Sequence, residues 1–171
     1  LGVTKADLHH ATRRVTELQI ASTSYLIYPD VLPALRDLRR LGITIGIVSN
    51  FAWDLPRLTA DLGLAPLVDD VVTSARIGFR KPRPEIFGLA ATCLGARSET
   101  SAFVGDDPIC DIEGARSAGL RGILVDRMNL RRSPTAAADP GVGAPLASAR
   151  WCDCIRLLTE LPALIRADPP I

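Results

Sequence analysis

The chain has 171 residues, of which 47% are hydrophobic and 23% are charged, a balance typical of one globular domain rather than a disordered segment. Its formal net charge of +1 gives no electrostatic basis for binding nucleic acid or an anionic membrane. No apolar run approaches the roughly 20 residues of a membrane span. The four cysteines are sparse for a chain of this length, so we expect a reducing, cytoplasmic setting.

The first 42 residues carry two helical patterns separated by an extended one. Apolar residues at helical spacing predict a helix over 5–21, with Thr4 as its cap. The stretch at 23–28 is rich in β-forming residues. A second helix is predicted over 30–42, because leucines keep the helical spacing and Gly42 supplies a typical end.

From residue 43 onward, strand and helix patterns alternate with short connections. The stretch 43–50, ITIGIVSN, is apolar almost throughout, which predicts a strand buried on both faces. A Pro/Ala/Gly-rich loop at about 131–149 interrupts the alternation, and a helix is predicted over 153–165. The alternation predicts an α/β fold, with a parallel sheet covered by helices on both faces. The remaining elements are strands over 68–74, 100–107 and 121–127 and helices over 53–64, 83–95 and 110–120.

Polar side chains gather in three groups near the ends of the predicted strands. Ser49 and Asn50 close the strand at 43–50, and Lys81 lies in a segment between a strand and a helix. In such sheets, ligands bind beyond the carboxyl ends of the strands. Clustered carboxylates repel one another unless a cation lies among them, and Mg²⁺ prefers oxygen ligands. The third group is such a cluster: Asp106, Asp107 and Asp111.

These residues resemble three motifs of the haloacid dehalogenase-like hydrolases, a family made up mostly of phosphatases. Its second motif, a strand ending in Ser or Thr, is matched by GIVSN with Ser49. Its third, a lysine before a proline and a helix, is matched by Lys81 in KPRPEIF. Its fourth, an acid pair after an apolar strand, is matched by Asp106 and Asp111 in VGDDPICD. The resemblance covers residues 25–127 and implies a Rossmann-like three-layer sandwich.

The resemblance also implies roles for the matched side chains. Ser49 and Asn50 would contact a phosphoryl group. Lys81 would balance charge and orient the attacking carboxylate. The implied magnesium site is formed by Asp106 as a ligand, Asp111 holding the site in place, and Asp107 as a further contributor.

The family's first motif, Asp-x-Asp-x-Thr, has no match in this chain. That motif supplies the nucleophile and the general acid and base, and nowhere are two aspartates spaced by one residue. Asp7 and Asp30 stand at predicted helix starts, where capping explains them better. We therefore expect a partial hydrolase, with residues 1–24 as the remnant of a helical cap and residues 25–171 as the core.

In the family the missing motif lies on a strand between the one ending at Ser49 and the one ending at Gly105. Its loss would leave two interior strands with unpaired backbone groups. Three outcomes are open: the two strands pair directly, residues 23–28 fill the place, or a missing piece or another chain supplies the strand. We expect an isolated chain to be unstable or prone to self-association.

The sequence therefore indicates a magnesium-dependent phosphatase-type hydrolase for a small phosphorylated metabolite, with little or no activity as it stands. The alternative is a non-catalytic protein that kept the fold and binds phosphate or a partner. A receiver domain of two-component signalling is disfavoured, because there the acid pair comes early and the lysine late. Three other features are interpreted as incidental: the pair His9 and His10, and the pair Cys152 and Cys154, and the glycines at 141 and 143.

Overall fold

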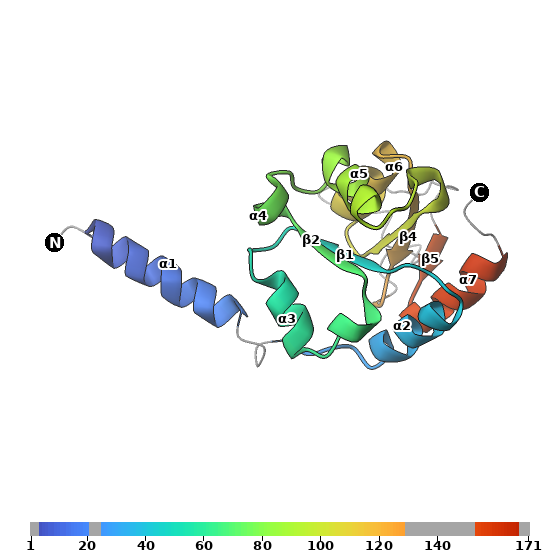
Figure 1. The fold of residues 1–171 in the computed structure, drawn as a ribbon, viewed down its shortest axis with the longest axis horizontal. Coiled ribbons are helices and arrows are strands. Elements are labelled where there is room, and N and C mark those ends of the chain that lie inside the picture. The colour runs from blue at the N-terminus through green and yellow to red at the C-terminus, as the bar shows by residue number, and fades with distance from the viewer. Residues whose placement is uncertain (1–3, 21–24, 129–152, 168–171) are drawn as a thin grey trace.

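The structure is a computed structural model, and it describes residues 4–20, 25–128 and 153–167. Helices and strands alternate as the sequence predicts (Figure 1). The helices are α1 (Lys5–Ile20), α2 (Val31–Arg40), α3 (Leu55–Asp61), α4 (Ser74–Ile77), α5 (Pro84–Cys93), α6 (Gly114–Ser117) and α7 (Leu161–Ala167). The strands are β1 (Gly46–Ser49), β2 (Asp70–Thr73), β3 (Ala102–Gly105), β4 (Arg121–Val125) and β5 (Asp153–Ile155).

The strands form two parallel sheets rather than one. In the first sheet β1 pairs with β2, so that Ser49 lies opposite Thr73. In the second, β4 lies between β3 and β5, so that Gly105 lies opposite Leu124. Within the described part of the chain, β1 and β3 each have a ladder on one edge only. The direct pairing of these two strands, one of the outcomes left open by the sequence, does not occur.

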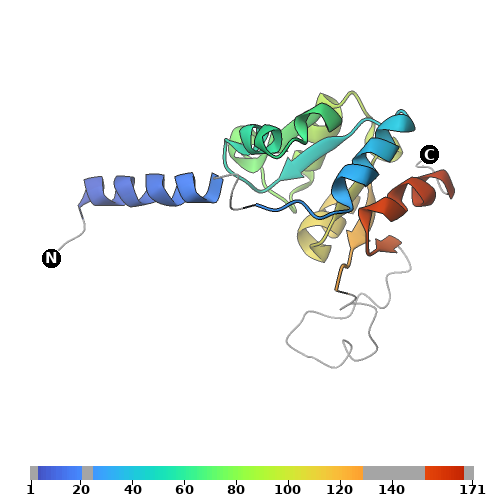
Figure 2. The same ribbon diagram turned by 90° about the horizontal axis from the view of Figure 1, so that it is seen from below.

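Helices cover both faces of the strands and create two apolar clusters, which confirms the three-layer α/β architecture (Figures 1 and 2). On one face α5 and α6 pack against the strands around Phe87 and Ala115, both almost fully buried. On the other face α2 and α7 pack around Ile123, with Leu38 and Leu161.

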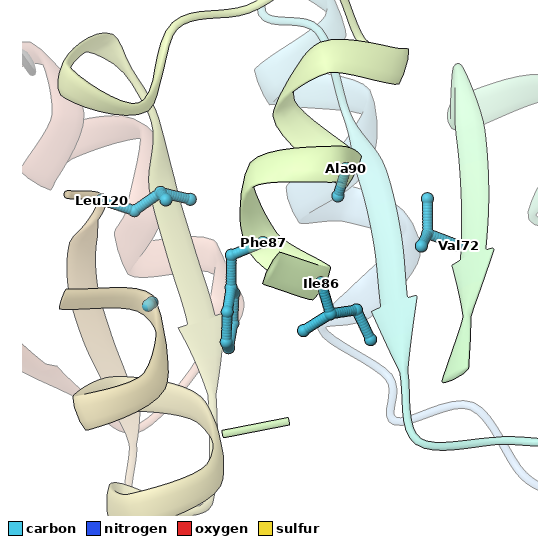
Figure 3. Close-up of a cluster of buried hydrophobic side chains, with 6 residues drawn as sticks. Val72, Ile86, Phe87, Ala90 and Leu120 are labelled. Carbon is cyan, nitrogen blue, oxygen red and sulfur yellow. The ribbon is translucent and has the colours of Figure 1, made fainter. Parts of the chain in front are cut away.

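Helices, not strand ladders, join the two sheets. On one face, α5 reaches both: the Phe87 ring meets the Phe103 ring of β3 edge-on with centroids 4.9 Å apart, and the same apolar cluster contains Val72 of β2 (Figure 3). On the other face, Leu38 of α2 shares a cluster with Ile45, next to β1, and with residues of β3 and β4. The space between β1 and β3 is therefore bridged by helices on both faces, and no strand of residues 4–20, 25–128 or 153–167 fills it.

This arrangement corrects two expectations about the first half of the chain. The strand predicted over 43–50 is not buried on both faces: Gly46 is exposed, and the rest of β1 is only half-buried, because one edge has no neighbour among the described strands. Residues 25–28, the described part of the 23–28 stretch, form no strand, and the Leu26 side chain is 95% exposed. They therefore do not fill the gap either.

The prediction of a helix over 153–165 is wrong at its start. Asp153–Ile155 is strand β5, which pairs with β4, and Asp153 accepts a hydrogen bond of 2.8 Å from Arg121 Nε. A short 3₁₀ turn at Leu158–Glu160 then leads into α7. Three residues are too few to show a strand period, so only the pairing with β4 reveals this element.

The N-terminal helix α1 projects away from the rest of the molecule in both views (Figures 1 and 2). It begins as predicted: Asp7 N donates to Thr4 Oγ1, and Thr4 N donates to Asp7 Oδ2, a reciprocal cap. Its Leu8 and Val15 side chains are more than half exposed. The expected role of residues 1–24 as a cap remnant stays a prediction, and most of the loop at about 131–149 lies outside the described residues.

A π-helical turn at Pro108–Glu113 leads directly into α6, where one regular helix was predicted. The 3₁₀ turns at Ala65–Leu67 and Ser98–Thr100 connect the other elements. No helix in the described part of the chain is both long and apolar enough to cross a membrane.

Candidate active site

The polar residues singled out by the sequence gather where β1 and β3 end. Ser49 is the last residue of β1, and Asn50 follows it. Asp106 directly follows β3, and its side chain is exposed. Because both strands end at the same side of the molecule, their following residues meet there, as in other parallel sheets.

At the centre of the site lies a buried ion pair between Lys81 and Asp111. Lys81 Nζ donates to Asp111 Oδ1 at 2.5 Å, and the two side chains are 13% and 4% exposed. The second carboxylate oxygen, Oδ2, accepts a hydrogen bond of 3.1 Å from the Asp107 backbone N–H. Lys81 Nζ also lies 5.2 Å from the centre of the Phe103 ring. The Asp111 carboxylate is therefore already neutralised by a cation of this chain.

Asn50 holds the main chain of Lys81. Its Nδ2 donates to Lys81 O at 2.9 Å, and its Oδ1 accepts from Lys81 N at 2.7 Å. This reciprocal pair fixes the lysine segment, 31 residues away in sequence, against the end of β1. The contact of Asn50 with a phosphoryl group stays a prediction, and the geometry makes it first a positioning residue for Lys81.

The two remaining acids of the cluster differ in their surroundings. Asp107 caps the turn that follows it, since its Oδ1 accepts hydrogen bonds of 2.8 Å from both Ile109 N and Cys110 N. Asp106, by contrast, has no hydrogen bond or ion pair recorded among the described residues, and it lines the cleft between the sheets. Its carboxylate is thus the one acid of the cluster available to an added ligand.

Gly105 is required at the end of β3 because Asp111 lies against it. A Cβ at this position would overlap the carboxylate of Asp111, with the Asp111 Cβ only 2.5 Å away. Gly114 similarly allows the close approach of the Phe87 ring and of the Pro82 backbone, 2.9 Å from where its Cβ would be. Gly105 and Gly114 therefore let the segment that carries Lys81 and the segment that carries Asp111 come together.

Cys110 lies beside the acid cluster but is a poor nucleophile. Burial raises the pKa of its thiol, and so do the charge and hydrogen bonding of Asp107 and the charge of Asp111, while Lys81 acts weakly in the opposite direction. The thiolate is the reactive form, so a raised pKa keeps this cysteine protonated and unreactive at neutral pH.

The described residues fit a magnesium ion only in part. Nowhere in residues 4–20, 25–128 or 153–167 do three or more His, Cys, Asp or Glu residues lie close enough to hold a metal. Asp111 is neutralised by Lys81 and Asp107 caps a turn, which leaves Asp106. Mg²⁺ is commonly held by one or two carboxylates, waters and substrate phosphate. The chain can therefore supply one such carboxylate, with the other ligands coming from elsewhere.

A second buried acid, Asp30, was misjudged from the sequence. Its side chain makes no cap at the start of α2. Instead it accepts hydrogen bonds from Arg127, at 2.9 and 3.0 Å, and from Leu158 N at 2.7 Å. Burial raises the pKa of Asp30, but the hydrogen bonds from Leu158 and Arg127 outweigh it, so the pKa lies below its ordinary value of 3.8. Arg127 and Leu158 lie 97 and 128 positions away from Asp30 in the sequence, and no local pattern links residues so far apart.

Two hollows adjoin the site. A cleft of about 1120 Å³ runs between β1 and β3 and contains Asp106 in its lining. A smaller pocket of about 600 Å³ lies beside Asn50, and is lined also by the aromatic rings of Tyr25, Phe51 and Phe79 and by Arg80.

The sequence model of the family described as haloacid dehalogenase-like hydrolase matches residues 2–119. The chain belongs to this family. Among curated relatives, it is 37% identical over 120 residues to phosphoserine phosphatase of Thermus thermophilus, covering 70% of this chain and 48% of that protein. It is 40% identical over 101 residues to glyceraldehyde 3-phosphate phosphatase of Methanopyrus kandleri, covering 58% and 43%. The chain thus spans about half the length of the curated relatives it matches.

Solved structures support the same fold. A HAD phosphatase from Thermococcus onnurineus superposes with a TM-score of 0.70 at 26% identity, covering 90% of this chain and 64% of that one. The L-2-haloacid dehalogenase of Xanthobacter autotrophicus superposes with a TM-score of 0.63 at 27% identity, covering 82% and 61%. The Rossmann-like core expected from the motifs is therefore confirmed, and the neighbours include enzymes of two different reactions.

Proposed function

We propose that this chain carries part of a magnesium-dependent phosphatase centre for a small phosphorylated metabolite and has little or no activity without a further carboxylate. Several of its curated relatives are named as phosphatases of small molecules, among them phosphoserine phosphatase and glyceraldehyde 3-phosphate phosphatase. The free thiols of Cys93 and Cys110 accord with a cytoplasmic, reducing setting, which is part of the proposal.

The observation that carries the proposal is the contrast between Asp106 and Asp111. Asp111 is buried and paired with Lys81, whereas Asp106 is exposed and pairs with no cation among the described residues. A bound cation at Asp106 would reduce repulsion among the acids and attract the phosphoryl oxygens. When bound, Mg²⁺ would supply charge stabilisation for these oxygens.

The chain's own residues would bind and orient the phosphoryl group. The Ser49 hydroxyl, at the end of β1, would donate a hydrogen bond to a phosphoryl oxygen. Lys81 would hold a positive charge beside the same group, fixed at its main chain by Asn50 and at its ammonium by Asp111. None of the three acids of this cluster is available to attack phosphorus in this arrangement, since Asp107 caps a turn, Asp111 is paired with Lys81, and Asp106 would hold the cation.

The remainder of the substrate would enter the pocket beside Asn50. Its aromatic rings suit a compact organic group, and Arg80 is exposed at its lining, where it can meet an acidic substituent. A small phosphorylated metabolite with a second polar group fits this pocket better than a large apolar ester does.

Calorimetric titration of the chain with inorganic phosphate, with and without Mg²⁺, tests the binding part of the proposal. We expect binding only with Mg²⁺, and a loss of about 10-fold in affinity, on the order of 1.4 kcal/mol, in Asp106→Asn. Glu99→Gln, at another exposed acid, is the control and should bind like the wild type. Magnesium-independent binding, or an unaffected Asp106→Asn variant, would overturn the metal role.

Turnover of para-nitrophenyl phosphate tests the activity part. We expect none above background for the isolated chain. Hydrolysis that disappears in Asp106→Asn would show that the chain is an active phosphatase after all. The second candidate, a non-catalytic phosphate-binding protein, is favoured by the absence of a nucleophile. Magnesium-dependent phosphate binding without turnover, even when a carboxylate such as acetate is added in excess, would support it.

A further inference from the structure

The pocket beside Asn50 carries one charged side chain, the guanidinium of Arg80. Its volume of about 600 Å³ is within the range of pockets that bind small molecules. Among the described residues that line it, no other is charged. Three of them are aromatic, and the rings of Tyr25 and Phe51 meet edge-on with centroids 6.2 Å apart. The pocket therefore sets one positive charge in a lining that is otherwise neutral and partly aromatic.

Arg80 is not neutralised by an acid of this chain. Its side chain is exposed, and its guanidinium has no hydrogen bond or ion pair with any residue of the described ranges. The neighbouring cations are engaged. Lys81 pairs with Asp111, as described above, and Arg83 Nη2 lies 2.6 Å from Glu85 Oε1. Arg80 therefore keeps all five of its N–H donors for a ligand.

The main chain of Arg80 is fixed on both sides. On one side, the Phe79 ring packs against the apolar cluster of α5 and α6, and the Arg83 guanidinium lies 5.1 Å from the ring centre. On the other side, Asn50 holds the main chain of Lys81 through two hydrogen bonds. Because its neighbours are already ordered, binding a ligand to Arg80 costs little backbone entropy.

A turn brings this segment to the pocket. Helix α4 follows β2 directly (Figure 1). It is capped by Thr73, whose Oγ1 accepts a hydrogen bond of 3.2 Å from Arg76 N, and it ends at Gly78 with a φ of 76°. This left-handed conformation favours glycine and turns the chain back at the helix end. Residues on both sides of the turn therefore line one pocket: Ser74, Ala75, Phe79 and Arg80.

The pocket adjoins the residues proposed to hold the phosphoryl group. Asn50, which follows Ser49 at the end of β1, is part of the pocket lining. Arg80 and Lys81 are consecutive, and consecutive Cα atoms lie about 3.8 Å apart across a trans peptide. A compact ligand that meets Ser49 and Lys81 with one anionic group can therefore reach Arg80 with another.

We propose that Arg80 binds a carboxylate of the substrate, so that this centre selects phosphate monoesters whose alcohol part carries a carboxylate on a compact, planar or apolar skeleton. This inference rests on the proposed function, which places the phosphoryl group at Ser49 and Lys81. A carboxylate accepts two parallel hydrogen bonds from a guanidinium. The aromatic rings of the lining pack against the skeleton between the two anions. Arg80 sets the choice of substrate and takes no part in the chemical step.

Two other charge patterns match the lining less well. A substrate ammonium group would meet the charge of Arg80, with no carboxylate among the described lining residues to balance it. A second phosphate carries up to about two negative charges, whereas these residues supply one cation. A carboxylate, with one negative charge, matches that cation.

Aryl phosphates that differ in one substituent test this selectivity. Phenyl phosphate has no second charge, 3- and 4-carboxyphenyl phosphate add a carboxylate, and 4-(aminomethyl)phenyl phosphate adds an ammonium group. Calorimetric titration of the full chain in Mg²⁺ gives each affinity. We expect the better carboxyphenyl ester to bind about 10-fold tighter than phenyl phosphate, and the ammonium ester to bind no tighter. Equal affinities for the first two, or a preference for the ammonium ester, would overturn the proposal.

Three variants assign the preference to one side chain. In Arg80→Gln, the ratio of carboxyphenyl to phenyl phosphate affinity should fall from about 10 to about 1. Arg80→Lys should give an intermediate ratio, because lysine keeps the charge but lacks the planar fork of donors. The control Arg97→Gln removes an exposed arginine before the turn that leads to the opposite, amino end of β3, and should keep the ratio. An unchanged ratio in Arg80→Gln, or an equal loss in Arg97→Gln, would contradict the assignment.

Benzoate, which has no phosphoryl group, separates this inference from the proposed function. Without Mg²⁺ or phosphate, we expect benzoate to shift the amide resonances of Phe79 and Arg80 in the wild type but not in Arg80→Gln, and benzyl alcohol to shift neither. If phosphate esters do not bind, the proposed function fails, and the benzoate response alone decides whether the carboxylate site stands. If they bind with a ratio near 1, the proposed function stands and the carboxylate site is overturned.

Discussion

Strands β4 and β1 have similar apolar sequences but very different surroundings. In β4, which lies between β3 and β5, Ile123 is fully buried and Leu124 is 6% exposed. In β1, Ile47 and Val48 remain half-buried, although α2 and α5 cover the strand. The difference teaches that neighbouring strands, more than covering helices, decide how fully an apolar strand is shielded from water.

The same difference extends to the ends of the strands. Among the described strands, only β4 neighbours the carboxyl end of β3, yet the Lys81–Asp111 pair and the close contact at Gly105 hold this end in place. On the β4 side, Asp30 ties α2 to Arg127 and Leu158, residues that follow β4 and β5. Polar contacts therefore supplement the ladders on both sides, by different means.

The largest expected effect is that of removing the cation at the end of β3. Lys81→Met leaves the buried Asp111 carboxylate without its partner, which should lower the free energy of unfolding by about 3–5 kcal/mol. Urea unfolding measures this. The control Arg83→Met removes an exposed ion pair with Glu85 and should change little. Equal effects of the two variants would mean that the buried pair does not hold this end of β3.

A matched pair of isoleucines tests the contrast between the strands directly. Ile123→Ala in β4 should lower the unfolding free energy by about 3 kcal/mol, because it creates a cavity in a closed core. Ile47→Ala in β1 should cost about 1 kcal/mol, because that side chain already faces the cleft. Urea midpoints measure both. Similar losses would contradict the idea that neighbouring strands decide the burial.

A smaller effect is expected from filling the space at Gly105. Gly105→Ala would press against Asp111 and should destabilise the protein by about 2 kcal/mol. The control is Gly88 of α5, where a Cβ meets nothing within 4 Å. Gly88→Ala should raise stability by about 0.5–1 kcal/mol, because alanine favours the helix. A neutral Gly105→Ala variant would show that the end of β3 can shift freely.

The smallest effect concerns pH and the β4 side. The folded pKa of Asp30 lies below the ordinary value of 3.8, so its contribution is present above that value and is lost as the pH falls through the folded pKa. Between about pH 6 and pH 3, the wild type should therefore lose more stability than Asp30→Asn. Urea midpoints across this range measure the difference. Parallel pH curves for the two proteins would show that Asp30 contributes nothing through its charge.

Local patterns in the sequence determined much of the fold. The helix end at Gly42 was readable because its positive φ angle of 76° favours glycine. The cap at Thr4 and Asp7 was readable because its partners are three residues apart. The order of the strands and helices followed from the apolar patterns, and it located Ser49, Lys81 and the acid cluster at strand ends.

Tertiary structure alone decided which of these residues meet and what lies between them. Asn50 binds the backbone of Lys81 and Asp30 binds Arg127, pairings 31 and 97 residues apart that no local pattern encodes. Strand β5 exists only through its ladder with β4, and the cleft exists because β1 and β3 have no common neighbour among the described strands. Local conformation depends on residues nearby in sequence. Burial and charge pairing depend on distant segments brought together in space.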